Sequence, residues 1–267
     1  MRMHETVDSS SNSLSAMNFI NREFVSNQKA LSPLKDQNRL FKAMSDTDWQ
    51  RILPYIEAVD LPVEMILSTS NMKRSHVYFP STAVVSILHE LKEGASTEVA
   101  VIGNEGLVGV CIFMDSESSS SVAMVKIAGS GYRIKSSIIL EVFNQSRSLQ
   151  NLILHFTQAL ITQITQTAVC NRHHLIDQQL SRILLSSLDR LQGNEIRLTQ
   201  EMIALLLGVR REGVTGAALK LQASHLIKYA RGHITVVDRT GLEHQSCECY
   251  QVVKKEYARL LPARMTT

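Results

Sequence analysis

Residues 198–222 read LTQEMIALLLGVRREGVTGAALKLQ, and they decide the interpretation of the whole chain. Thr199 is a residue type that caps helices, and the apolar segment from Glu201 to Leu207 is predicted to form the helix that follows it. Gly208 supplies the left-handed backbone that a sharp turn requires. A second helix is predicted from Arg210 to Gln222. Its inward face is expected to consist of Val214, Ala218 and Leu221.

The segments on either side complete a small domain. Asp177 to Leu191 has apolar residues at helical spacing and ends before Gly193, a residue that commonly stops a helix. After the second helix, residues 226–237 alternate around Arg231 and Gly232, which predicts a β-hairpin. These elements together predict a winged helix-turn-helix domain over residues 177–267, closed by a C-terminal helix.

Basic side chains gather around the two helices, although the whole chain carries a formal charge of only +3. An arginine at the start of a helix opposes the helix dipole, so Arg210 and Arg211 are a poor choice for stability alone. A guanidinium group matches O6 and N7 of guanine, or two phosphate oxygens. The second helix is therefore expected to enter the major groove of double-stranded DNA, with its first residues at the base edges.

The candidate DNA-contacting residues lie on the two helices and at the tip of the hairpin. They are Thr199, Gln200, Arg210, Arg211, Glu212, Thr215, Lys220 and Arg231. Glu212 either accepts a hydrogen bond from cytosine N4 or offsets the charge of Arg211, and both interpretations stay open. Thr215 and Lys220 are either DNA contacts or ordinary surface residues. Arg231, at the tip of the wing, is expected to reach backbone phosphate.

Upstream, the pattern changes to short β-branched runs separated by turn residues. The predicted strands are Ile66–Thr69, Val77–Phe79, Val84–Leu88, Glu98–Ile102, Leu107–Phe113, Val122–Ile127 and Tyr132–Ile134. Such strands predict an antiparallel, jelly-roll-like β-roll, and a sensor domain is expected over residues 34–145 of an α+β fold. Two short helices between Asp36 and Ala58 belong to this domain. Residues 1–33 are rich in Ser and Asn and are expected to form a flexible arm.

A long amphipathic helix is predicted from Leu149 to about His174, within a dimerisation segment over residues 146–176. A helix of that length between two domains usually packs against a partner, although burial within its own subunit is the alternative. The expected dimer interface consists of Leu149, Ile153, Phe156, Leu160, Ile164 and Ala168.

The sequence contains few motifs for catalysis, disulfide bonding or metal binding. The chain has no Ser nucleophile elbow, phosphate-binding loop or His-Glu-x-x-His run, so an enzyme is not expected. The four cysteines give no disulfide framework, and Cys247-x-Cys249 is a weak metal signal, with His244 nearby, because two thiolates lack further ligands. His173 and His174 could in principle bind haem or a metal. Adjacent helical residues point about 100° apart, however, so a satisfied or surface histidine pair is expected instead. We therefore expect neither a metal nor a cofactor.

With its β-rich domain, long helix and winged helix-turn-helix in this order, the chain resembles the Crp/Fnr family of bacterial transcription regulators over roughly residues 34–250. The resemblance is strongest at 198–214, at YFP (78–80) and at GNEGLVG (103–109). It implies that Arg211 and Glu212 are the family's base-reading pair, and that Gly216 stands where a further base-reading residue is expected. The operator preference should therefore differ from that of the best-known member.

The ligand pocket departs from the cyclic-nucleotide-binding members of that family. Their Gly-Glu pair for the ribose falls here at Gly109 and Val110, and their phosphate-binding Arg falls at Ser121, two residues before Ala123. Without that Arg the pocket, which also includes Ser120, loses a strong charge-assisted contact. We expect that cAMP does not bind there. An iron–sulfur sensor of the Fnr kind needs several cysteines near the N-terminus, and residues 1–110 contain none.

The sequence thus predicts a dimeric, sequence-specific transcription regulator that reads a twofold-symmetric operator with residues 210–222. The alternative is a sensor resembling the cyclic-nucleotide-binding domain that acts through protein contacts without binding DNA. The expected partners are double-stranded DNA and a second copy of the chain, with RNA polymerase and an unknown small-molecule effector left open. No apolar run is long enough to span a membrane and no signal peptide is recognised, so no membrane contact and a cytoplasmic location are expected.

Overall fold

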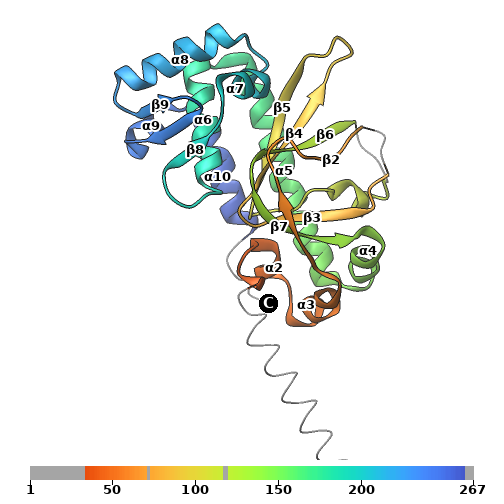
Figure 1. The fold of residues 1–267 in the computed structure, drawn as a ribbon. Helices are drawn as coiled ribbons and strands as arrows, with labels where there is room; N and C mark the ends of the chain where they lie inside the picture. The colour runs from red at the N-terminus through yellow and green to blue at the C-terminus, as the bar shows by residue number, and fades with distance from the viewer. Residues whose placement is uncertain (1–33, 71–72, 117–119, 262–267) are drawn as a thin grey trace, which may run out of the picture.

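The computed structural model describes residues 34–70, 73–116 and 120–261. A β-rich domain is followed by one long helix and then by a smaller domain that combines helices with a three-stranded sheet (Figure 1). This is the α+β class and the order of parts that the sequence predicts. The arm predicted for residues 1–33 lies outside the described residues. No helix in the described parts of the chain combines the length and the apolar character that crossing a bilayer would require.

Two short helices, α2 (Arg39–Ala43) and α3 (Asp46–Ile52), precede the sheets. The buried Asn38 caps α2 and also donates hydrogen bonds to the backbone oxygens of Pro80 and Gly106, which fixes α2 on the roll. The helical region ends earlier than predicted, in the 3-10 helix η1 (Leu53–Tyr55), which contains Pro54. Strand β1 (Glu57–Leu61) follows, and most of its side chains are exposed or half-buried, so no clear hydrophobic alternation marks it.

The roll consists of two antiparallel sheets. One has the order β1-β7-β3, with β3 at His76–Pro80 and β7 at Gly129–Lys135. The other has the order β2-β6-β4-β5. Its strands are β2 (Ile66–Ser68), β6 (Ser121–Ile127), β4 (Val84–Glu90) and β5 (Ser96–Ile102). Six of the seven predicted strand regions therefore contain a strand.

The prediction of a strand at Leu107–Phe113 is wrong. Val108 makes only an isolated bridge to Tyr78, and the segment continues as the 3-10 helix η2 (Val110–Met114). Gly109 takes a left-handed backbone with φ 111°, which ends the extended conformation. The apolar run is explained by continuous burial of a loop, since Leu107, Val108 and Ile112 are all 5% exposed or less.

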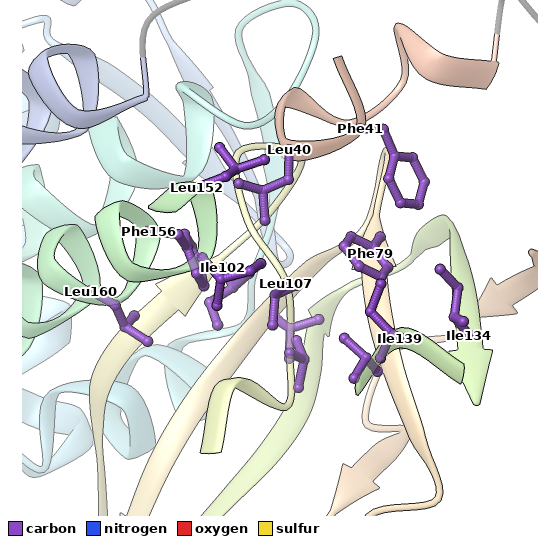
Figure 2. Close-up of a cluster of buried hydrophobic side chains, with 14 of the residues drawn as sticks. Leu40, Phe41, Phe79, Ile102, Leu107, Ile134, Ile139, Leu152, Phe156 and Leu160 are labelled. Atoms are coloured by element: carbon purple, nitrogen blue, oxygen red, sulfur yellow. The ribbon is translucent and has the colours of Figure 1, made fainter. Parts of the chain in front are cut away.

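The long helix α5 (Arg147–His173) follows α4 (Ser136–Gln145) and covers the roll. Figure 2 shows Leu152, Phe156 and Leu160 directed toward the roll residues Ile102 and Leu107. Gly106 lies so close to the Phe156 ring that a Cβ there would collide with it. One apolar face of α5 is therefore part of the core of its own subunit.

The smaller domain begins with α6 (Ile176–Leu188). It continues with β8 (Glu195–Arg197), α7 (Gln200–Leu207), α8 (Arg211–Ala223), β9 (Ile227–Ala230), β10 (His233–Val236) and α9 (Arg239–Gln245). The sheet order is β8-β10-β9. The final helix, α10 (Glu248–Leu260), was predicted as part of this domain, but it packs on α5 and places Tyr257 and Leu260 in the core cluster of the roll.

Polar and apolar contacts join the two domains. The buried Arg190, just after α6, donates from Nε to Glu105 of the roll over 2.8 Å and from Nη2 to the backbone oxygen of Val101 over 3.3 Å. Thr97 of β5 donates to the backbone oxygen of Leu206 in α7 over 3.3 Å. The helix-turn-helix thus rests on the β4–β5 hairpin, as Figure 1 shows.

Candidate DNA-binding surface

Helices α7 and α8 are joined by the turn that the sequence predicts. Thr199 caps α7 by accepting a hydrogen bond from the backbone N–H of Met202 over 3.1 Å. Gly208 ends α7 in the left-handed region with φ 65°, and a Cβ at this position would lie 3.3 Å from Thr97 of the roll. Both the backbone conformation and the close approach therefore favour glycine at the turn.

Helix α8 buries one face and exposes the other. The buried residues are Val214, Ala217, Ala218 and Leu221, which include the three predicted inward positions. Arg210, Arg211, Glu212, Gly216 and Lys220 are exposed. Since Arg210 occupies the N-cap position, without a capping hydrogen bond, and Arg211 is the first residue of α8, both arginines stand at the end that a recognition helix presents to base edges.

Arg211 forms an ion pair that the sequence analysis did not anticipate. Its Nη1 lies 2.9 Å from Oε1 of Glu201 in α7, and the two side chains are 63% and 60% exposed. An exposed pair of this kind contributes about 0–1 kcal/mol, so an anionic partner can replace Glu201 at little cost. Among the described residues it is Glu201, and not Glu212, that forms the ion pair with Arg211.

Thr215 and Gln200 hold the two helices together. The Thr215 hydroxyl donates to Oε1 of Gln200 over 2.9 Å and lies 3.1 Å from the backbone oxygen of Arg211. Lys220, with 72% of its side chain exposed, has its Nζ 3.9 Å from Asp177 at the start of α6. Thr215 and Gln200 thus lie near the start of α8 and Lys220 in its last turn, and the DNA contacts of all three remain predictions.

The wing is a two-residue hairpin fixed against both helices. Arg231 and Gly232 have φ values of 50° and 78°, which is the left-handed pair that a type I′ turn requires. The Tyr229 hydroxyl donates to the backbone oxygen of Leu198 over 2.9 Å. The backbone N–H of Tyr229 donates to Oε1 of Gln222 over 2.6 Å. Burial raises the pKa of Tyr229 to about 12, so the phenol stays protonated as a donor. Arg231 is exposed at the tip, as predicted.

The predicted dimer interface needs a correction. Leu149, Ile153, Phe156 and Leu160 are at most 7% exposed within a single chain and belong to the core cluster of the roll, so no partner can reach them. Ile164 is 38% exposed and Ala168 is also exposed. The accessible apolar row on α5 keeps these last two residues and adds two that were not predicted. It consists of Leu154, Ile161, Ile164 and Ala168.

The predicted effector residues lie on two elements. Gly109 and Val110 are at the start of η2, whereas Ser120, Ser121 and Ala123 lie at or just before the start of β6. Ser120 is exposed, and Ala123 is 2% exposed, facing the core of the roll.

Arg74 connects η2 with β2, the strand that pairs with β6, and nothing in its sequence context marked it. It donates to Sγ of Cys111 over 2.6 Å and to Oγ of Ser68 over 3.2 Å. Ser68 pairs with Ala123 across the sheet. A guanidinium group therefore does approach the predicted pocket, from the segment before β3.

Comparisons with known proteins agree with this geometry. Residues 178–245 match the profile of the Crp-like helix-turn-helix domain. The fold is similar to a Crp/Fnr-family regulator from Eubacterium rectale, with a TM-score of 0.62 and 17% identity over 79% of this chain and 98% of that one. FixK2 from Bradyrhizobium japonicum gives a TM-score of 0.61 and 15% identity over 72% and 98%.

A third similar structure is the c-di-GMP-responsive regulator CLP from Xanthomonas campestris, with a TM-score of 0.57 and 18% identity over 72% of this chain and 99% of that one. No curated protein matches the chain in sequence. The chain therefore carries a Crp-like helix-turn-helix domain within the fold of the Crp/Fnr transcription regulators.

Proposed function

We propose that this protein is a sequence-specific, DNA-binding transcription regulator of the Crp/Fnr type that works as a homodimer. The observation that carries the proposal is the exposure of Arg210 and Arg211 at the start of α8, on a helix-turn-helix whose opposite face is buried. The roll contacts the turn and α7, and leaves both guanidinium groups accessible.

In the proposed complex, α8 lies in the major groove with its N-terminal residues at base edges. Arg211 leaves Glu201 and donates to O6 and N7 of a guanine, while Glu212 accepts from a cytosine N4. Arg231 at the wing tip contacts a backbone phosphate. Gly216 has nothing within 4 Å of the position that a Cβ would take, so it presents bare backbone at the site where a further base-reading side chain would stand.

The proposed dimer interface is the accessible row on α5. Leu154, Ile161, Ile164 and Ala168 recur at steps of three, four and seven residues, which is the spacing of the a and d positions of a coiled coil. Ile161 at 58% and Leu154 at 55% are exposed apolar side chains that a second copy of α5 would cover. Two chains paired along this row would present two α8 helices to half-sites about 34 Å apart.

An interface variant tests the dimer. Ile161→Asp places a carboxylate from each chain at the centre of the pairing row, so we expect a monomer by sedimentation and a large loss of operator affinity. Thr162→Asp, at the next and half-buried position on the same helix, is the matched control. A dimer that persists in Ile161→Asp would rule out the proposed interface.

The effector is proposed to be something other than cAMP. Val110 has no group that accepts from a ribose hydroxyl, and Ser121 stands where the resemblance expects the phosphate-binding Arg. Arg74, which bridges η2 and β2, is the basic side chain that approaches this region in the described structure.

Binding-site selection from randomised DNA duplexes tests the proposed function directly. We expect an enriched, twofold-symmetric sequence with half-sites one helical turn apart, and an affinity that falls steeply with salt through counterion release. A pure, folded dimer that retains no duplex even at low ionic strength would contradict the proposal. That result would favour a sensor acting through protein contacts.

A further inference from the structure

Three cysteines and a histidine from distant parts of the chain meet where α5 ends and α10 begins. They are Cys170, His174, Cys247 and Cys249, and their ligand atoms all lie within 4.8 Å of one another. The three cysteines form a buried cluster of their own, separate from the two large apolar cores of the described residues. We propose that this cluster is a structural Zn²⁺ site of the Cys₃His type.

The positions of the four residues suit a single tetrahedral ion. Cys170 lies in the last turn of α5, and His174 is the C-cap residue just past its end, where their ligand atoms lie within 4.8 Å of each other. Cys247 occupies the N-cap position of α10, and Cys249 lies in the first turn of that helix. The Sγ atoms of Cys170 and Cys247 are 3.4 Å apart, and Sγ of Cys249 is 3.6 Å from Nδ1 of His174.

These separations match the chemistry of zinc. Zn–S bonds of about 2.3 Å in tetrahedral geometry place two sulfur ligands about 3.8 Å apart. Small shifts of the side chains would therefore place all four donors around one ion. Structural zinc sites use four protein ligands with no open position, and Cys₃His is one of their regular donor sets.

The orientation of His174 is a second, independent observation. Its Nε2 lies 3.3 Å from a carboxylate oxygen of Glu248, while its Nδ1 faces Cys249. A metal-binding histidine almost always donates its other ring N–H to a carboxylate or carbonyl, because that bond fixes the tautomer and turns the free lone pair toward the metal. Glu248 gives His174 this arrangement.

The charge around the cluster also fits. Zn²⁺ with three thiolates and a neutral imidazole carries one net negative charge, because binding releases the three thiol protons. The buried Arg182 of α6 donates to Thr167 and acts electrostatically on Cys170. Among the described residues, its Nε has no hydrogen-bond acceptor. Arg182 is thus a buried cation available to balance the thiolate charge.

The site would join three helices at the junction of the domains. Cys170 lies in the last turn of α5 and His174 directly follows that helix. Gln179 of α6 donates to the backbone oxygens of both residues, and the other two ligands lie at the start of α10. Zinc here would clamp the C-terminal helix to the long helix beside the α5–α6 connection.

The metal content of the purified, reduced full-length protein tests the site without DNA. We expect about one zinc per chain, as a single closed tetrahedral site requires. Cys249→Ser and His174→Ala should lose this zinc. Their matched controls, Cys111→Ser in the roll and His173→Ala at the neighbouring exposed position, should keep it.

Four results would overturn the proposal. They are metal-free protein with all four thiols reactive, a Cys170–Cys247 disulfide on non-reducing mass analysis, iron with inorganic sulfide, and zinc retained by every variant. If the ligand variants do not fold, wild-type protein produced with cobalt in place of zinc decides the question. Tetrahedral thiolate coordination then gives intense visible bands, and their absence contradicts the site.

Discussion

Two Arg–Glu pairs in this protein have almost the same length and opposite surroundings. Arg190 and Glu105 lie 2.8 Å apart with side chains 7% and 6% exposed, whereas Arg211 and Glu201 lie 2.9 Å apart at 63% and 60%. In the buried pair, each charge is compensated by the other, because water is excluded and cannot solvate a charge left alone. In the exposed pair, water already solvates both side chains, so Arg211 can exchange Glu201 for DNA. Burial, and not distance, separates a structural pair from one that is available for binding.

The largest expected effect comes from breaking the buried pair. Arg190→Ala leaves the Glu105 carboxylate uncompensated between the roll and α6, so we expect a loss of about 3–5 kcal/mol in the free energy of unfolding. Urea unfolding of the purified protein measures it. The double variant Arg190→Met with Glu105→Leu should recover much of the loss, because it removes both charges. A single variant as stable as the wild type would contradict the structural role of the pair.

A smaller effect is expected at the turn between α7 and α8. Gly208→Ala must adopt a left-handed backbone and places a Cβ 3.3 Å from Thr97, so we expect a destabilisation of about 1–2 kcal/mol. Thermal unfolding checks the stability. Gly193→Ala, also at positive φ but with nothing within 4 Å, separates the backbone strain from the contact with the roll. Equal losses in the two variants would show that the contact with Thr97 adds nothing.

The smallest effect should be a gain in stability. Gly216 is an exposed position inside α8 with open space around it, so Gly216→Ala should stabilise the protein by up to about 1 kcal/mol. The same urea titration measures it, and no change would indicate that α8 frays at this point. Gly213→Ala is the contrasting variant, because its Cβ would lie 3.0 Å from Ile176 and the gain should be reduced.

Predictions from sequence succeeded where the backbone conformation depends on neighbouring residues in the chain. They failed where it depends on tertiary packing. The helix-turn-helix was predictable because Thr199, Gly208 and the Arg231-Gly232 turn mark its boundaries through local backbone chemistry. Strand β1 and the loop containing Val108 were not, because their conformation depends on what packs around them rather than on their own pattern.

Helix α5 shows most clearly what sequence periodicity alone does not predict. It carries two apolar rows, and periodicity alone does not say which one faces its own subunit. Phe156 and Leu160 belong to the row that the roll covers, while Ile161 and Leu154 belong to the accessible row. The association of Cys170 with the distant Cys247 was equally hidden, since only the return of α10 onto α5 brings them together.

Arg211, exposed at the start of α8, is the residue proposed to read the operator. The most direct measurement is the affinity of Arg211→Ala for the selected operator and for the same duplex with the contacted guanine replaced. We expect discrimination between the two to fall by about 1–3 kcal/mol while the dimer persists. Arg147→Ala, which removes the exposed first residue of α5, should leave it unchanged. Unaltered discrimination by Arg211→Ala would show that Arg211 does not read the operator.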